Sequence, residues 1–357
     1  MTEVQKFDFV KHGRNAREDF SKIRNQYEGL ATAIKLIIEN ALEHEKLLIH
    51  SIESRAKDLD SFEKKCLKPS KTDPEKPKYD NPLEQITDLS GVRIITFFLK
   101  TVEDIQVVLE REFDIIERID KSSILQEEEK FGYQSVHFLV KLKSNRASLP
   151  EYRLCNDLIC EIQIRTILQH SWAEIEHDIQ YKSVATIPSS IKRRFMALAG
   201  MLEVADREFQ AIQKEDLKLR ESARKSLKKG EVKGIEITPD ALKAYLDKNF
   251  GRDSRISPYG YEFTANMLKR LGFSSFEQLQ ECFVGYDADE INRVIYGTRQ
   301  GQLTRFEMIL LASMGQYYID NHPWVSSDWH TDMCNRQIEA LTKEGIDIGS
   351  YIPKQKS

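Results

Sequence analysis

Three polar side chains alternate with apolar ones between residues 160 and 165, and together they could bind a ligand and act on it. Glu161, Gln163 and Arg165 occupy every second position, so in an extended strand they share one face. A carboxylate, an amide and a guanidinium gain little from a pleated surface unless a ligand meets them. The segment therefore predicts one wall of a polar cleft.

A helical pattern follows this strand after Thr166. Its apolar positions lie three or four residues apart and are Leu168, Trp172, Ile175 and Ile179. The other side of the expected helix carries polar or aromatic side chains, namely His170, Glu174, His177 and Tyr181. The two stripes predict an amphipathic helix whose polar side extends the cleft wall.

Upstream, a long helix is expected from Asn15 to about His50, because apolar residues recur there at helical spacing. The next segment, 51–65, places Arg55, Lys57 and Ser61 close together near an expected helix start. Two cations, a hydroxyl and free backbone N–H groups suit a polyphosphate. The alternative is an ordinary solvated cluster of surface charges.

Three further strands are predicted from β-branched and aromatic content, over 92–98, 113–119 and 134–142. Asp88 precedes the first of them, where a carboxylate could either bind a metal or merely end the strand. Tyr133 precedes the third, directly after a glycine, and could stack on a base or fill a core.

The composition limits the class of protein. A chain of 357 residues exceeds a typical domain, and 31% charged residues suit a helix-rich protein with much exposed surface. The chain contains no apolar run near the roughly 20 residues that cross a bilayer. Its first 15 residues lack the apolar core of a signal peptide, so we expect a cytoplasmic location without membrane contact. Five scattered cysteines argue against a disulfide framework.

Four blocks now stand in order along the chain: SRAKDLDS, ITDLSGVRI, FGYQSVHFLV and EIQIRTILQHSWAEIEHDIQYK. Together they resemble the synthetase domain of the RelA/SpoT family, the alarmone synthetases, over roughly residues 20–200. The chain is most similar to short, synthesis-only members, with a C-terminal part added. The resemblance implies an α/β (α+β) fold of nucleotidyltransferase-like type, in which helices flank a mixed sheet of about five strands.

The resemblance also implies a reaction, which is the Mg²⁺-dependent transfer of pyrophosphate from ATP to the 3′-hydroxyl of GDP or GTP. Asp88 and Glu161 would hold Mg²⁺, and Glu161 would orient or deprotonate the hydroxyl. The positions implied for ATP are Arg55, Lys57, Ser61 and Arg93. The positions implied for the acceptor are Lys130, Tyr133, His137, Gln163 and Arg165.

One departure from the family pattern leaves the acceptor open. Members that bind GTP commonly have a lysine four residues before the tyrosine, but here Glu129 stands in that place and Lys130 follows it. A negative charge is unfavourable beside an acceptor triphosphate. Two alternatives therefore stay open: a toxin that pyrophosphorylates the 3′-terminal adenosine of tRNA, and a catalytically silent nucleotide-binding regulator. Paired carboxylates argue against the silent protein.

The remaining sequence predicts a long basic helix over 191–230, which is either a solvated face or a site for nucleic acid or an anionic nucleotide. A linker is expected at 231–237 between a catalytic domain, 1–230, and an all-helical domain, 238–357. The helical domain would serve regulation, binding of a protein partner or oligomer contact, and in a toxin it would control the activity. A metal site at His322, His330 and Cys334 is disfavoured by loose spacing.

Overall fold

The computed structural model describes residues 7–120, 135–182, 188–253 and 256–354. The chain divides into two compact units, Met1–Ile212 and Gln213–Ser357. The division falls inside helix α8 (Ser189–Lys229), upstream of the linker predicted at 231–237.

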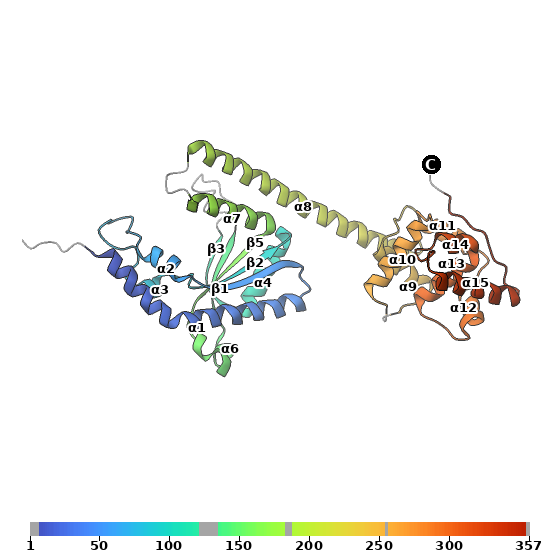
Figure 1. Cartoon of the computed structure of the whole chain (residues 1–357), viewed down its shortest axis with the longest axis horizontal. Coiled ribbons are helices and arrows are strands. Elements are labelled where there is room, and N and C mark those ends of the chain that lie inside the picture. The colour runs from blue at the N-terminus through green and yellow to red at the C-terminus, as the bar shows by residue number, and fades with distance from the viewer. Residues whose placement is uncertain (1–6, 121–134, 183–187, 254–255, 355–357) are drawn as a thin grey trace, which may run out of the picture. The chain divides into compact units, whose positions relative to one another are not determined.

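A mixed five-stranded sheet forms the centre of the first unit, with strand order β1-β2-β5-β4-β3 (Figure 1). The strands are β1 (Ile49–Ala56), β2 (Ser90–Thr96), β3 (Phe113–Asp120), β4 (Val136–Leu142) and β5 (Cys160–Thr166). β2 and β5 run parallel, whereas the other neighbouring pairs are antiparallel. The expected mixed sheet is confirmed.

Helices cover the sheet on both sides. They are α1 (Phe9–His44), α2 (Leu59–Cys66), α3 (Pro82–Gln85), α4 (Leu99–Glu112), α6 (Ser144–Ala147), the 3₁₀ helix η1 (Pro150–Cys155) and α7 (Ile167–Lys182). Leu30, Ile34 and Ile38 of α1 join the buried core beneath the sheet, while α7 lies over the other side (Figure 1). One face of the sheet is therefore closed by apolar packing, and the face toward α7 is left for polar side chains.

Strand β1 corrects the expected helix to about His50, because α1 ends at His44 and Ile49–Ala56 is extended. This edge strand pairs antiparallel with β2, which satisfies its backbone groups although most of its side chains are partly or fully exposed. Arg24 of α1 donates hydrogen bonds to the carbonyls of Ala56 and Lys57. The end of β1 is thereby fixed where the basic residues begin.

The second unit is helical, as expected. Beyond α8 it contains α9 (Pro239–Asn249), α10 (Pro258–Arg270), α11 (Phe276–Cys282), α12 (Ala288–Tyr296), α13 (Gln302–Met314), α14 (Gln316–Asn321) and α15 (Asp328–Lys343). Its core includes Leu242, Phe306 and Tyr318, and Ile237 of the expected linker is buried in the same core. Helices α13 and α14 are separated at Gly315, whose φ of 54° is left-handed.

His322, His330 and Cys334 do meet, but as part of this core. Each is at most 2% exposed, and the two imidazole rings stack with centroids 4.0 Å apart. Among the described residues, no group of three or more His, Cys, Asp or Glu side chains could hold a metal ion. No helix among the same residues has the length and apolar content of a membrane span.

Candidate active site

Strand register brings the predicted residues of three separate segments into one row. β2 pairs with β5 so that Gly91 lies opposite Glu161 and Arg93 opposite Gln163. On the other side of β2, Arg55 of β1 is the partner of Gly91. Gly91 has no side chain, so the space between Arg55 and Glu161 stays open.

A cleft of about 630 Å³ lies over this row. Its lining includes eight of the predicted site residues, namely Arg55, Lys57, Ser61, Asp88, Arg93, Glu161, Gln163 and Arg165. Helix α7 contributes Glu174 and His177 of its predicted polar side to this lining. The apolar stripe predicted for α7 is only partly buried, because Trp172 is 8% exposed but Ile175 is 55% exposed.

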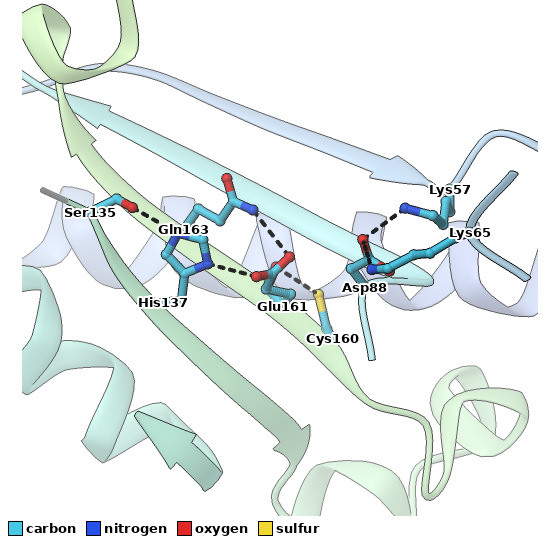
Figure 2. Close-up of polar contacts among 8 residues, drawn as sticks. All are labelled: Lys57, Lys65, Asp88, Ser135, His137, Cys160, Glu161 and Gln163. Atoms are coloured by element: carbon cyan, nitrogen blue, oxygen red, sulfur yellow. Dashed lines mark hydrogen bonds and ion pairs between the residues drawn. The ribbon is translucent and has the colours of Figure 1, made fainter. Parts of the chain in front are cut away.

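One end of the cleft is built around Asp88. The Nζ atoms of Lys57 and Lys65 lie 2.7 and 2.9 Å from its Oδ2 (Figure 2). Burial alone would raise the pKa of Asp88, but the two ammonium groups outweigh it and lower the pKa. Its other oxygen, Oδ1, is buried and has no hydrogen-bond partner among the described residues. The carboxylate is therefore ionised with one oxygen available.

Lys65 was not predicted from the sequence. It follows Ser61 by four residues on α2, so the two side chains lie one turn apart on the same face. Asp58 caps this helix by accepting a hydrogen bond from the backbone N–H of Ser61 at 3.0 Å. The cap fixes the start of α2 beside the end of β1, which brings Lys57 and Lys65 to the same carboxylate.

A second group of polar side chains is built around Glu161, further along the row than Asp88. His137 Nδ1 lies 2.6 Å from Glu161 Oε1, and Gln163 Nε2 donates to Oε2 at 3.1 Å (Figure 2). Ser135 Oγ lies 2.8 Å from the second ring nitrogen of His137. Burial would raise the pKa of Glu161, but His137 and Gln163 outweigh it and lower the pKa. His137 is 3% exposed, so its place is beneath Glu161 and not on the cleft surface.

Two arginines lie further along the parallel strands than Glu161, on the side away from Asp88, because Arg93 is opposite Gln163 and Arg165 is opposite Ile95. Arg93 pairs with Glu174 of α7 at 3.0 Å, which ties the sheet to the helix above it. Burial and the neighbouring charge of Arg93 lower the pKa of Arg165. Within the part of the chain that the structure describes, the Nε of Arg165 is buried without a hydrogen-bond partner. An anion bound in the cleft would stabilise the charged form of Arg165 and could accept a hydrogen bond from its Nε.

The predicted acceptor residues Lys130 and Tyr133 lie outside the described residues, as does Glu129. The structure therefore brings together the predicted ATP and metal positions with His137, Gln163 and Arg165.

The donor set fits a magnesium ion. Asp88 and Glu161 are both held in the ionised form, and they are close enough for the charge of Asp88 to act on the pKa of Glu161. The buried, unpartnered Oδ1 of Asp88 is a free ligand position. Mg²⁺ commonly takes one or two carboxylates and completes its shell with water and substrate phosphates.

Comparison with known proteins places this unit in a family. The family model described as "Region found in RelA / SpoT proteins" matches residues 54–186. The GTP pyrophosphokinase YwaC of Bacillus subtilis (strain 168) is 30% identical over 177 residues, which cover 49% of this chain and 76% of YwaC. The chain therefore belongs to the RelA/SpoT family.

Two further proteins are similar to the chain. The GTP pyrophosphokinase YjbM of the same organism is 30% identical over 138 residues, which cover 37% of this chain and 60% of YjbM. The crystal structure of small alarmone synthetase 1 from Bacillus subtilis has a TM-score of 0.46 at 22% identity, and the match covers 56% of this chain and 99% of that one.

Proposed function

We propose that the chain transfers the β,γ-pyrophosphate of ATP to the 3′-hydroxyl of GDP or GTP, which yields AMP and a (p)ppGpp-type alarmone. The observation that carries the proposal is the cleft, in which a lysine-held carboxylate and a histidine-held carboxylate lie on one face of the sheet. Membership of a family whose curated relatives are named GTP pyrophosphokinases supports the same reaction.

The Asp88 end suits the phosphates of ATP. Arg55, Lys57 and Lys65 supply three positive charges there, and Ser61 supplies a hydroxyl in the first turn of α2. Cations placed before the reaction lower the energy of charge that builds on the transferred group, without the cost of reorganising water. The basic residues would therefore bind ATP and stabilise the transition state.

Asp88 and Glu161 would hold Mg²⁺ through their carboxylate oxygens. When bound, the ion would neutralise phosphate charge and polarise the phosphorus under attack. The lysines beside Asp88 use Oδ2, so the buried Oδ1 can bind the ion without breaking either salt bridge.

Glu161 would also take the proton of the attacking hydroxyl. The 3′-oxygen of the acceptor forms a bond to the β-phosphorus of ATP, while the bond from that phosphorus to the bridging oxygen of AMP breaks. A lowered pKa keeps Glu161 unprotonated and ready as a base. His137 holds the orientation of the carboxylate, with Ser135 behind it.

The proposal is tested by incubating the 357-residue chain with γ-labelled ATP, Mg²⁺ and one acceptor at a time. The acceptors are GDP, GTP and deacylated tRNA. We expect label on the guanosine nucleotides. Label on tRNA alone would contradict the proposed acceptor, and transfer to none of the three would contradict the proposed activity. A parallel reaction with a chelator should abolish transfer, and undiminished transfer would contradict the role given to magnesium.

A further inference from the structure

The second unit contains a basic hollow of about 520 Å³ that the proposed reaction does not use. It lies among the end of α8, helix α9 and the segment after α9. Its basic side chains are Arg224, Lys228, Lys243, Lys248 and Arg252. We call this hollow the anion pocket.

Two carboxylates also line the anion pocket, but both are neutralised by partners. Asp240 pairs with Arg224 at 2.8 Å and with Arg220 at 3.3 Å. Asp247 pairs with Lys243 at 2.7 Å and accepts a further hydrogen bond from an amide side chain at 3.1 Å. These pairs leave the pocket with a surplus of positive charge.

The surplus charge belongs to Lys228, Lys248 and Arg252. Within the described part of the chain, no carboxylate forms an ion pair with any of the three, and each is exposed. Like charges gathered around one hollow repel one another, and a bound anion would remove that repulsion.

A glycine turn sets the position of one of these cations. Gly230, just after the last residue of α8, has a φ of 92°. A Cβ atom at this position would lie 2.4 Å from Lys248 Nζ. Because Gly230 has no side chain, the ammonium group of Lys248 can approach the backbone of Gly230. Gly230 lies two residues after Lys228, so the two cations are brought near each other.

We propose that the anion pocket binds a compact anion with two or more phosphoryl groups. Three unpaired cations from different segments surround a hollow whose volume is typical of ligand pockets. The lining contains no aromatic side chain for a base, so recognition rests on the charge of the phosphates. The triphosphate of a nucleotide and an inorganic polyphosphate share this chemistry. The site is independent of the proposed reaction.

The test is calorimetric titration of the full-length protein with inorganic tripolyphosphate. Because the active-site cleft could bind the same probe, all proteins carry Lys57→Ala and Lys65→Ala. Adding Lys248→Gln and Arg252→Gln should weaken binding by about a hundredfold, since each lost charge-assisted contact is worth about a factor of ten. The matched control, Arg336→Gln with Lys343→Gln, makes the same charge change on α15 of this unit and should alter binding less than about twofold.

Further titrations separate the sources of the anion. Equal affinities for tripolyphosphate, ATP and GTP are expected, and binding of only one nucleotide would overturn recognition by phosphate charge. The proposal would be overturned if tripolyphosphate did not bind or if tRNA were the only ligand that bound. It would also be overturned if the control variant lost as much affinity as the double variant. If the double variant does not fold, as judged by circular dichroism, Lys228→Gln tests the same site and should weaken binding about tenfold. Because the readout is binding, failure here is distinct from failure of the transfer assay.

Discussion

The active-site cleft of the first unit and the anion pocket of the second unit both combine acidic and basic side chains, but they leave different charges unpaired. In the cleft, two lysines share one oxygen of Asp88, while its other oxygen has no partner among the residues that the structure describes. In the anion pocket, both carboxylates are paired, and within the described ranges three cations are not. An available carboxylate oxygen can bind a metal ion, and unpaired cations can only attract an anion. The difference distinguishes the site that we propose for chemistry from the site that we propose for binding an anion.

The largest effect on transfer is expected from Glu161→Gln. The amide cannot accept the proton of the hydroxyl and is a poor ligand for Mg²⁺, so we expect a loss of about 10³-fold or more in kcat. The measurement is label transfer from ATP under saturating substrates. Asp157→Asn is the control, because it makes the same change at a residue with a left-handed φ of 64° that Asn tolerates, outside the cleft. A fully active Glu161→Gln protein would show that the cleft does not carry out the reaction.

A smaller effect, dependent on pH, is expected from His137→Gln. His137 lowers the pKa of Glu161, so its loss should raise that pKa and leave more of the base protonated in acid. The acidic limb of kcat/KM should therefore move to higher pH, and a limb displaced by about one pH unit lowers the rate there about tenfold. A pH–rate profile measures this. An unchanged limb with a uniformly lower rate would mean that His137 only supports the fold.

The next prediction tests whether ATP occupies the open space between Arg55 and Glu161. A Cβ at Gly91 would meet no atom closer than 3.9 Å, so Gly91→Val should fold while its side chain occupies the cleft. We expect about a tenfold rise in the KM for ATP with little change in the melting temperature. Gly29→Val on the exposed face of α1, where a Cβ meets nothing within 4 Å, is the control. An unchanged KM would show that ATP does not cross this row.

The smallest effect on transfer is expected from Phe306→Ala in the second unit. Phe306 is fully buried in a core formed only by residues of that unit, so the unit should lose about 3–5 kcal/mol of stability. Transfer should change less than about twofold while the second unit remains folded. Calorimetry and the transfer assay on the same sample measure both quantities. A large loss of transfer would show that the two sites are not separate in function.

Sequence patterns predicted the side-chain faces of the cleft but not the neighbours across it. The alternation from Cys160 to Arg165 is local, and the structure confirms it as alternating burial. The parallel pairing of β2 with β5 joins residues about 70 positions apart, and no local pattern encodes it. His137 shows the same limit, because its contact with Glu161 depends on the register between β4 and β5.

Other features were missed for different physical reasons. Strand β1 is an edge strand with few buried side chains, so its sequence lacks the apolar alternation that reveals a strand. Lys65 was detectable, since it stands one helical turn after Ser61, but only the position of Asp88 shows why both lysines matter. The unpaired state of Lys248 and Arg252 depends on contacts made by other residues, so the basic composition of the region could not reveal it.

The central proposal is that the Asp88 group and the Glu161 group of the cleft act on one pyrophosphate group. The most direct test uses ATP labelled at both the β- and γ-phosphates, with GDP or GTP as acceptor and separation of the products. We predict that both labels reach the acceptor in equal amounts and that the AMP released carries neither. Transfer of the γ-label alone, with labelled ADP as the second product, would contradict the proposal.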